Sequence, residues 1–209
     1  MKTGGKTGRG CLLSILVCLL VAIGLSVHPI SLKLMGGQLR HEDKIFPSDA
    51  LFVPRFEEDR DGDLYIDAFR EYWAGNGRII YVEEDRAFGT SILEPIHRMA
   101  QQRGIKDNVV RKIEVEGDDI GKTRKTKRAF AALGLKKMII LVPEYASRRY
   151  HILYRDSVIN GKMVYLIKPV GVSSFKIDRW WKEGRSRIIF LREVFAMASL
   201  AVDRFKGPR

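Results

Sequence analysis

The chain has 209 residues, 45% hydrophobic and 30% charged, which is enough to bury one globular core and too little for two ordinary domains. Its formal net charge of +12 favours an anionic partner, such as a phosphorylated ligand, an acidic polymer, an anionic lipid or a nucleic acid. Both cysteines, Cys11 and Cys18, lie in an apolar N-terminal run, which excludes a disulfide framework, a thiolate metal site and a catalytic cysteine from the remaining sequence.

The first predicted element is a membrane anchor. Residues 11–27 are 17 residues without a charge, and they follow a basic, glycine-rich tail at residues 1–10. This run is at the short end for a spanning helix and long for the apolar part of a signal peptide. We predict one uncleaved transmembrane helix, with a cleaved signal peptide and a lipoprotein as alternatives. The two flanks of this run carry equal numbers of basic residues, so these do not decide its orientation. The free amino terminus and the nearby Arg9 favour an N-terminus in the cytoplasm, which places the domain on the outer side of the membrane.

A repeating unit follows a predicted juxtamembrane linker at residues 28–48. Strand candidates begin near residues 50, 78, 109, 138 and 164, at separations of 26 to 31 residues. This spacing accommodates a strand, a helix and a return connection, which is the repeat of a βαβ array. We predict an α/β domain over residues 49–205, a Rossmann-like three-layer sandwich with a mainly parallel five-stranded sheet, and a short tail at residues 206–209.

Two of the predicted helices carry patterns that bear on function. Residues 122–133 form a helix whose exposed side carries the basic residues Lys122, Arg124, Lys125, Lys127 and Arg128. The C-terminal helix has apolar residues near one side, namely Ile188, Leu191, Phe195, Ala198, Val202 and Phe205. Packing of this side against the sheet is the favoured interpretation. An amphipathic helix on a bilayer, with Trp180 and Trp181 at the interface, is the alternative.

Several motifs that would define a reaction are absent from the sequence. Gly121-Lys122-Thr123 lacks the earlier glycine of a phosphate-binding P-loop, and the first strand runs into Pro54 without the glycines of a dinucleotide fingerprint. The four histidines show no ligand spacing, and no G-x-S-x-G elbow occurs. We therefore predict no cofactor and no metal.

Charged residues gather at the predicted carboxyl ends of the strands. Arg55 follows the first strand, Glu116 the third, and Arg149 the fourth. Because the carboxyl ends of parallel strands share one edge of a sheet, these side chains are expected to lie near one another in a cleft. Ordinary surface ion pairs are the alternative interpretation. The candidate anion-binding residues are Arg55, Lys122, Thr123, Arg148 and Arg149, and the candidate catalytic residue is Glu116.

Five segments, taken in order, carry a family resemblance. They are SDALFVP, AFREYWAGNGRIIYVEEDRA, EVEGDDIGKTRKTKRA, IILVPEYASRRYHILYR, and the Trp180-Trp181 pair with Glu193. In order and spacing they resemble the YdcF-like family, also called domain of unknown function 218, from about residue 48 to residue 205. The resemblance implies a Rossmann-like domain of bacterial envelope proteins with phosphate-side or nucleotide-like ligand binding, and Glu116, Thr123 and Arg149 match the family's polar residues.

The resemblance and the basic strand ends together suggest a function. We hypothesise a single-pass inner-membrane protein of cell-envelope or polysaccharide biogenesis that binds a phosphorylated or lipid-linked carbohydrate, alongside other envelope-biogenesis proteins. Arg149 and Lys122 would hold the anion, and Glu116 would orient the ligand or accept a proton. The alternative is a non-catalytic interaction domain, because the family's glycine turns are replaced. A weaker alternative is a cytoplasmic-facing binder of nucleic acid or anionic polymer through the basic helix.

Overall fold

A computed structural model describes residues 24, 28–84, 91–155 and 163–205. Its five strands form one parallel sheet in the order β3-β2-β1-β4-β5, which confirms the predicted α/β fold. The strands are β1 (Ala50–Val53), β2 (Ile80–Glu84), β3 (Val110–Glu114), β4 (Lys137–Pro143) and β5 (Val164–Val170). The predicted anchor at residues 11–27 lies outside the described residues, apart from Gly24. Among the described helices, none combines the length and the apolar composition that crossing a membrane requires.

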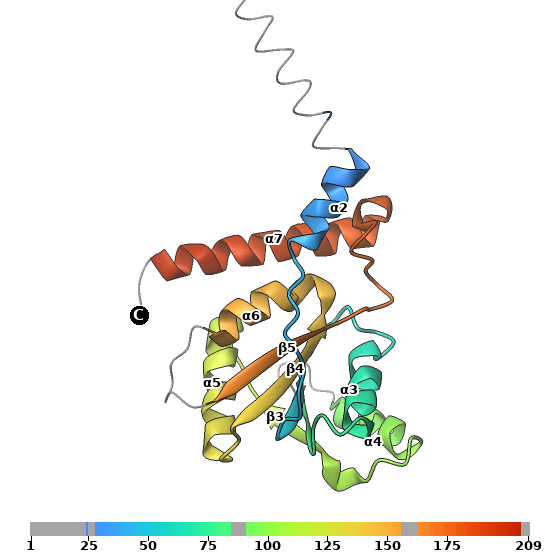
Figure 1. The fold of residues 1–209 in the computed structure, drawn as a ribbon, viewed down its shortest axis with the longest axis vertical. Helices are drawn as coiled ribbons and strands as arrows, with labels where there is room; N and C mark the ends of the chain where they lie inside the picture. Colours follow the sequence, from blue (N-terminus) through green and yellow to red (C-terminus); the bar gives the residue numbers. More distant parts are fainter. Residues whose placement is uncertain (1–23, 25–27, 85–90, 156–162, 206–209) are drawn as a thin grey trace, which may run out of the picture.

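Helices cover both faces of the sheet, as Figure 1 shows. The helices α5 (Asp119–Ala132) and α6 (Ser147–Arg155) lie on one face, and α3 (Asp63–Trp73) and α4 (Leu93–Gln101) on the other. Alternate strand residues enter two separate cores: Phe52 packs in the core that contains Phe130 of α5, and Leu51 in the core that contains Phe69 of α3. The two central strands, β1 and β4, are therefore buried on both faces, as their continuous apolar runs indicate.

Part of the predicted linker at residues 28–48 is helical. The helix α2 (Pro29–Gly37) begins after His28, whose Nδ1 accepts a hydrogen bond from the Ile30 N–H at 3.3 Å. Proline in the first turn is well tolerated because its missing N–H would have no helical partner there. The Trp180 Nε1–H donates to the main-chain oxygen of Leu32 at 2.8 Å and thereby fixes α2 to the short helix η4 (Trp180–Lys182).

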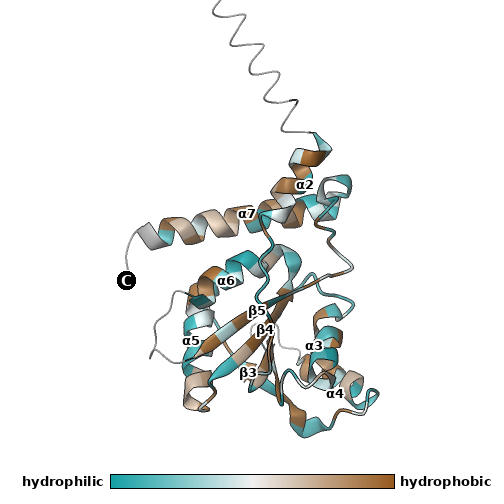
Figure 2. Cartoon of the chain, viewed as in Figure 1, coloured by the Kyte–Doolittle hydropathy of each residue, from teal (hydrophilic) through white to brown (hydrophobic). Residues whose placement is uncertain are grey.

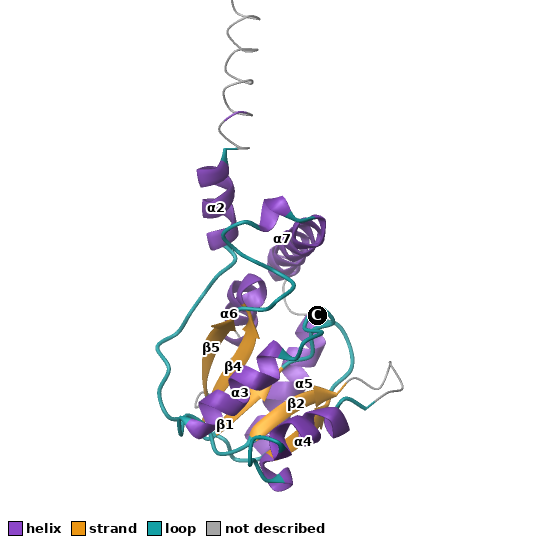
Figure 3. Cartoon of the chain, turned by 90° about the vertical axis from the view of Figure 1, so that its right-hand side faces the viewer, coloured by secondary structure: helices purple, strands orange, loops and turns teal. Residues whose placement is uncertain are grey.

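Gly36 is required for this close packing of α2. A Cβ at this position would lie 2.4 Å from the main-chain oxygen of Ile177 and 2.8 Å from the Trp180 ring. Any other residue would therefore push α2 away from η4. Figure 3 shows α2 and the C-terminal helix α7 (Gly184–Phe205) together at one end of the molecule, beyond α6.

The interpretation that the apolar stripe of the C-terminal helix packs against the sheet is wrong. The buried side of α7 carries Ser186, Ile189, Phe190 and Glu193. The predicted packing side carries Ile188, Leu191, Phe195 and Val202, and all four are exposed, Ile188 at 68% and Phe195 at 69%. The helix has two apolar sides, and a period of 3.6 residues identifies such a side without saying which one is covered.

Lys127 also differs from its prediction as part of an exposed basic face. It is buried under α6, and its Nζ donates to the main-chain oxygens of Leu153 and Tyr154, each at 2.8 Å. The same nitrogen lies 5.0 Å from the centre of the Tyr154 ring and 5.3 Å from that of Tyr165, within cation–π range. The long lysine side chain thus supports the C-terminal end of α6 from inside the core.

Stability is expected to rise with pH because of Lys127. Burial lowers its pKa from 10.5 to about 8, so between these values the unfolded chain binds the proton and the folded chain releases it. The free energy of unfolding should therefore increase by roughly 1 kcal/mol from about pH 8 to about pH 9, a range that stays below the ionisation of tyrosines in the unfolded chain near pH 10. Urea unfolding across this range measures the slope. Lys127→Met should flatten it, and an equal slope in that variant would contradict the assignment.

Candidate functional site

The strand order places a topological switch point between β1 and β4. The chain leaves β1 toward β2 and leaves β4 toward β5, so the loops after these two strands diverge and open a crevice at the carboxyl edge. Residues 54–58 follow β1, and the short helix η3 (Glu144–Ala146) and then α6 follow β4. Helix α7 contributes Arg192, Glu193 and Ala196 to the crevice and borders it on the outer side.

A cleft of about 350 Å³ lies at this crevice. It is lined by Arg55, Phe56, Glu57, Glu58, Asp119, Arg149, Tyr150, Arg192, Glu193 and Ala196. A neighbouring cleft of about 290 Å³ shares Asp119, Arg149 and Ala196 and continues along α7 to Asp203. The first cleft is at the small end of the range for small-molecule sites, and Arg149 borders both clefts. Arg149 is therefore the centre of the candidate site.

Arg149 holds α5, α6 and α7 together through two carboxylates. Its Nε and Nη2 donate to the two carboxylate oxygens of Glu193 at 2.7 and 3.1 Å, a bidentate pair. Its Nη1 donates to Asp119 at the start of α5. Arg149 and Glu193 are both buried, whereas half of the Asp119 side chain is exposed. All three donor groups of the guanidinium are thus directed at carboxylates.

Burial and mutual attraction shift the pKa values of Arg149 and Glu193. Burial alone would lower the pKa of Arg149, but the Glu193 carboxylate outweighs this effect, and the pKa is raised. Burial raises the pKa of Glu193, and the attraction of Arg149 offsets part of that rise. Arg149 therefore carries its charge at every pH at which the protein is folded, and Glu193 is the group whose charge is costly to maintain.

A second network lies at the larger cleft, to which it contributes Glu58 and Arg192. Glu58 forms an ion pair with Arg192 of α7 and accepts a hydrogen bond from the Tyr145 hydroxyl at 3.3 Å. Burial, with the nearby Glu58 carboxylate, raises the pKa of Tyr145, so its hydroxyl stays protonated as a donor. The rings of Phe56 and Tyr150 lie 5.5 Å apart and form an aromatic wall. The cleft thus presents donors, acceptors and ring faces together.

The structure brings only two of the predicted site residues into this cleft, Arg55 and Arg149. Lys122 forms an ion pair with Glu83 at 3.1 Å, and the Thr123 hydroxyl donates to the main-chain oxygen of Asp119, one helical turn earlier. Arg148 donates to the main-chain oxygen of Arg40, on a different side of α6. In the described part of the chain, these three residues therefore have structural partners and line neither cleft.

Glu116, the predicted catalytic residue, is exposed and lines neither cleft among the described residues. Its main-chain oxygen accepts a hydrogen bond from the Lys125 Nζ at 2.8 Å. This bond holds the backbone of the loop and does not involve the Glu116 carboxylate. Asp119, three residues later, occupies the position at the cleft that the prediction gave to Glu116. The loop after β3 begins two strands further from the switch point than the loop after β1, and the chain reaches the cleft only at the start of α5, where Asp119 lies.

Glu58 and Arg192 are site residues that sequence reasoning missed. Glu58 lies in a loop without a periodic pattern. Arg192 lies on α7, for which the sequence analysis used only the spacing of the apolar residues. The three carboxylates at the centre of the cleft, Glu58, Asp119 and Glu193, are each bonded to an arginine. Such a set has its negative charge compensated and is unsuited to a resident metal ion.

Comparisons with known proteins add no assignment to these clefts. The sequence matches no protein-family model and no curated protein.

Proposed function

We propose that the chain is a membrane-anchored, YdcF-like protein of the bacterial inner membrane, which binds the polar part of a phosphorylated or lipid-linked carbohydrate in cell-envelope or polysaccharide biogenesis. One observation carries the proposal: the helix that borders the cleft, α7, has an uncovered apolar outer side. A site under such a helix is accessible to a ligand whose lipid part stays in the bilayer.

The lipid bilayer is the surface that fits the outer side of α7. The exposed large apolar residues of the two helices are Ile30, Leu34 and Met35 of α2 and Ile188, Leu191, Val194, Phe195 and Val202 of α7. Figure 2 shows hydrophobic residues on both helices. An exposed apolar surface of this extent marks an interaction site, and a helix of this kind lies in the plane of a membrane interface.

Two further features favour a bilayer over a protein partner. The uncharged run at residues 11–27 ends directly before α2, so an anchor there would place α2 at the membrane surface. Exposed basic residues surround the start of α7, where anionic lipid headgroups would meet them: Lys176, Arg179, Lys182, Arg185 and Arg187. Each positive charge near an anionic surface contributes about 1 kcal/mol to membrane attraction.

The chemistry of the cleft fits a sugar better than a bare phosphate. Three arginines and four carboxylates line it, so an isolated anion would compete with Glu193 and Asp119 for Arg149. A sugar hydroxyl both donates and accepts, and can bond to paired carboxylates and guanidinium groups without separating them. Arg192, half exposed at the cleft edge, is the group best placed to receive a phosphate as well.

Non-catalytic binding is the second candidate function. The position of Glu116 outside the cleft and the pairing of Asp119 and Glu193 with Arg149 leave these carboxylates engaged rather than poised to move a proton. A domain that retains a ligand or a partner protein in the envelope without converting it would use the same cleft.

Arg192→Gln is expected to weaken binding of a sugar phosphate about tenfold, because it removes a charge-assisted hydrogen bond at the cleft edge. The full chain in lipid nanodiscs would be titrated calorimetrically with glucose 1-phosphate, glucose and inorganic phosphate. Arg187→Gln is the control, since Arg187 is exposed on the same helix and lines neither of the two clefts. The proposal predicts tightest binding of glucose 1-phosphate. Equal binding of all three probes, or equal losses in both variants, would remove it.

A further inference from the structure

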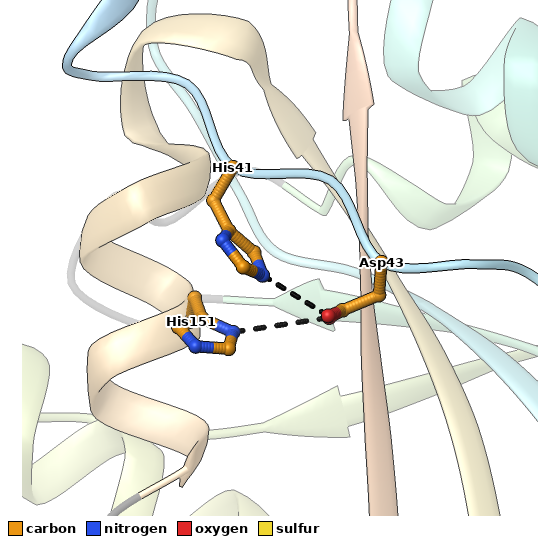
Figure 4. Close-up of side chains that lie close together, drawn as sticks. All are labelled: His41, Asp43 and His151. Carbon is orange, nitrogen blue, oxygen red and sulfur yellow. Dashed lines mark hydrogen bonds and ion pairs between the residues drawn. The ribbon is translucent and has the colours of Figure 1, made fainter.

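Two histidines and one aspartate from distant parts of the sequence meet beside β5, as Figure 4 shows. His41 and Asp43 are two residues apart on an extended segment, so their side chains point to the same side. His151 projects toward them from α6. The His41 Nε2 lies 3.0 Å from one oxygen of Asp43, and the His151 Nδ1 lies 3.8 Å from the other. The imidazole rings are adjacent, with centres 3.5 Å apart.

We propose that His41, Asp43 and His151 bind a divalent transition metal ion of the zinc class. One ligand atom from each residue lies within 4.8 Å of the other two. Ligand atoms about 2.0–2.2 Å from a shared zinc ion lie roughly 3–3.5 Å apart, so small side-chain rotations bring the three groups into coordination distance. A set of three protein ligands leaves a further position for water or an additional ligand.

The surroundings hold the ligands in place. The second oxygen of Asp43 accepts a hydrogen bond from the Ile167 N–H at 2.8 Å, and the Asp43 N–H donates to the Ile167 main-chain oxygen at 3.0 Å. The main-chain N–H of His41 donates a hydrogen bond to the Ser147 hydroxyl oxygen at 2.8 Å. The bond to the Asp43 carboxylate orients that ligand directly, and a partner of this kind is worth roughly 10- to 100-fold in metal affinity, whereas the two main-chain bonds position the segment that carries His41 and Asp43. The backbone of this segment and the Asp43 carboxylate are therefore held in place before an ion arrives.

The ligand types select the class of metal. Two imidazoles and one carboxylate suit zinc, nickel, copper or iron, whereas magnesium and calcium require oxygen ligands. The three side chains are each about a quarter exposed, at 25%, 24% and 22%, so an ion can enter from solvent.

Metal binding would join the segment after α2 to the α/β domain. His41 and Asp43 lie between α2 and β1, while His151 belongs to α6, which packs on the sheet. A bound ion would therefore fix the position of α2 relative to the cleft. This role stands independently of the ligand that the cleft binds.

Isothermal titration of the metal-free full chain in nanodiscs with zinc chloride tests the site. One equivalent should bind, and His151→Ala and Asp43→Asn should each weaken binding at least about 100-fold, while magnesium gives no signal. His97→Ala is the matched control, because His97 lies on α4, away from the cluster, with its Nε2 hydrogen-bonded to the main-chain oxygen of Val110 in β3. Unchanged zinc affinity in His151→Ala, or no zinc binding in the unmodified chain, would overturn the proposal.

A second measurement avoids any dependence on variant folding. The chain contains four histidines, so histidine-selective isotope labelling resolves each imidazole by NMR. Substoichiometric cobalt(II) should broaden and shift the His41 and His151 signals strongly and those of His28 and His97 only weakly, because paramagnetic effects decrease steeply with distance from the ion. Equal effects on all four would show nonspecific association and contradict a built site.

Discussion

Replacing Arg149 by alanine is expected to lower the free energy of unfolding by about 3–5 kcal/mol. The substitution leaves Glu193 buried without its bidentate partner and frees Asp119 at the start of α5. Removal of one member of a buried ion pair is costly because the remaining charge keeps its desolvation penalty. Urea unfolding of the full chain in mild detergent, with far-UV circular dichroism as the signal, measures the loss.

The matched control is Arg155→Ala, on the same helix and exposed to solvent. It should change stability by less than about 1 kcal/mol. The double variant Arg149→Met with Glu193→Met should recover most of the loss, since apolar replacement of a whole buried pair is often neutral. A loss below about 1 kcal/mol in Arg149→Ala, or no recovery in the double variant, would show that this pair does not hold α7 against the domain.

The variant Ile188→Glu with Phe195→Glu is expected to release α7 from the bilayer. Each apolar side chain contributes roughly 1.5–3 kcal/mol when it moves from water into an apolar phase, so two charged replacements shift the docked state by at least about 100-fold. Quenching of Trp180 and Trp181 fluorescence by brominated lipids reports docking. All proteins compared carry Trp73→Phe, so that only these two tryptophans contribute to the signal. Strong quenching in the unmodified chain should fall in the double variant.

Leu133→Glu controls for the mere loss of an exposed apolar residue. Leu133 is 53% exposed, but it lies at the far end of α5, away from α2 and α7. Its replacement should leave the quenching unchanged. Equal quenching in all variants would mean that the outer side of α7 does not contact lipid, although a membrane anchor at residues 11–27 could still exist.

The fold followed from local patterns in the sequence. The apolar runs at residues 50–53 and 138–142 are too short and too continuous for amphipathic helices, and the regular spacing of such runs is typical of a parallel array. The helix at residues 29–37 was missed because its apolar residues form no stripe. It is defined by its His28 cap and by its contact with Trp180, a residue more than 140 positions away.

The site was predictable only where a loop leaves a central strand. Arg55 and Arg149 follow β1 and β4, which flank the switch point, and both reach the cleft. Lys122 and Glu116 follow β3, and their places depend on strand order, which the sequence spacing did not specify. The partnership of His41 with His151 spans 110 residues and has no local signature apart from the His-x-Asp pair.

The proposed function depends on α7 lying on a bilayer above the cleft, and nitroxide labelling measures this placement. In a chain with Cys11→Ala and Cys18→Ala, single labels would be introduced by Phe195→Cys on α7 and by Arg124→Cys on α5, and the protein reconstituted into nanodiscs. We expect the label at position 195 to be accessible to oxygen in the lipid phase and shielded from a water-soluble nickel complex, and the label at position 124 to show the reverse. Equal access of the nickel complex to both labels would contradict this placement.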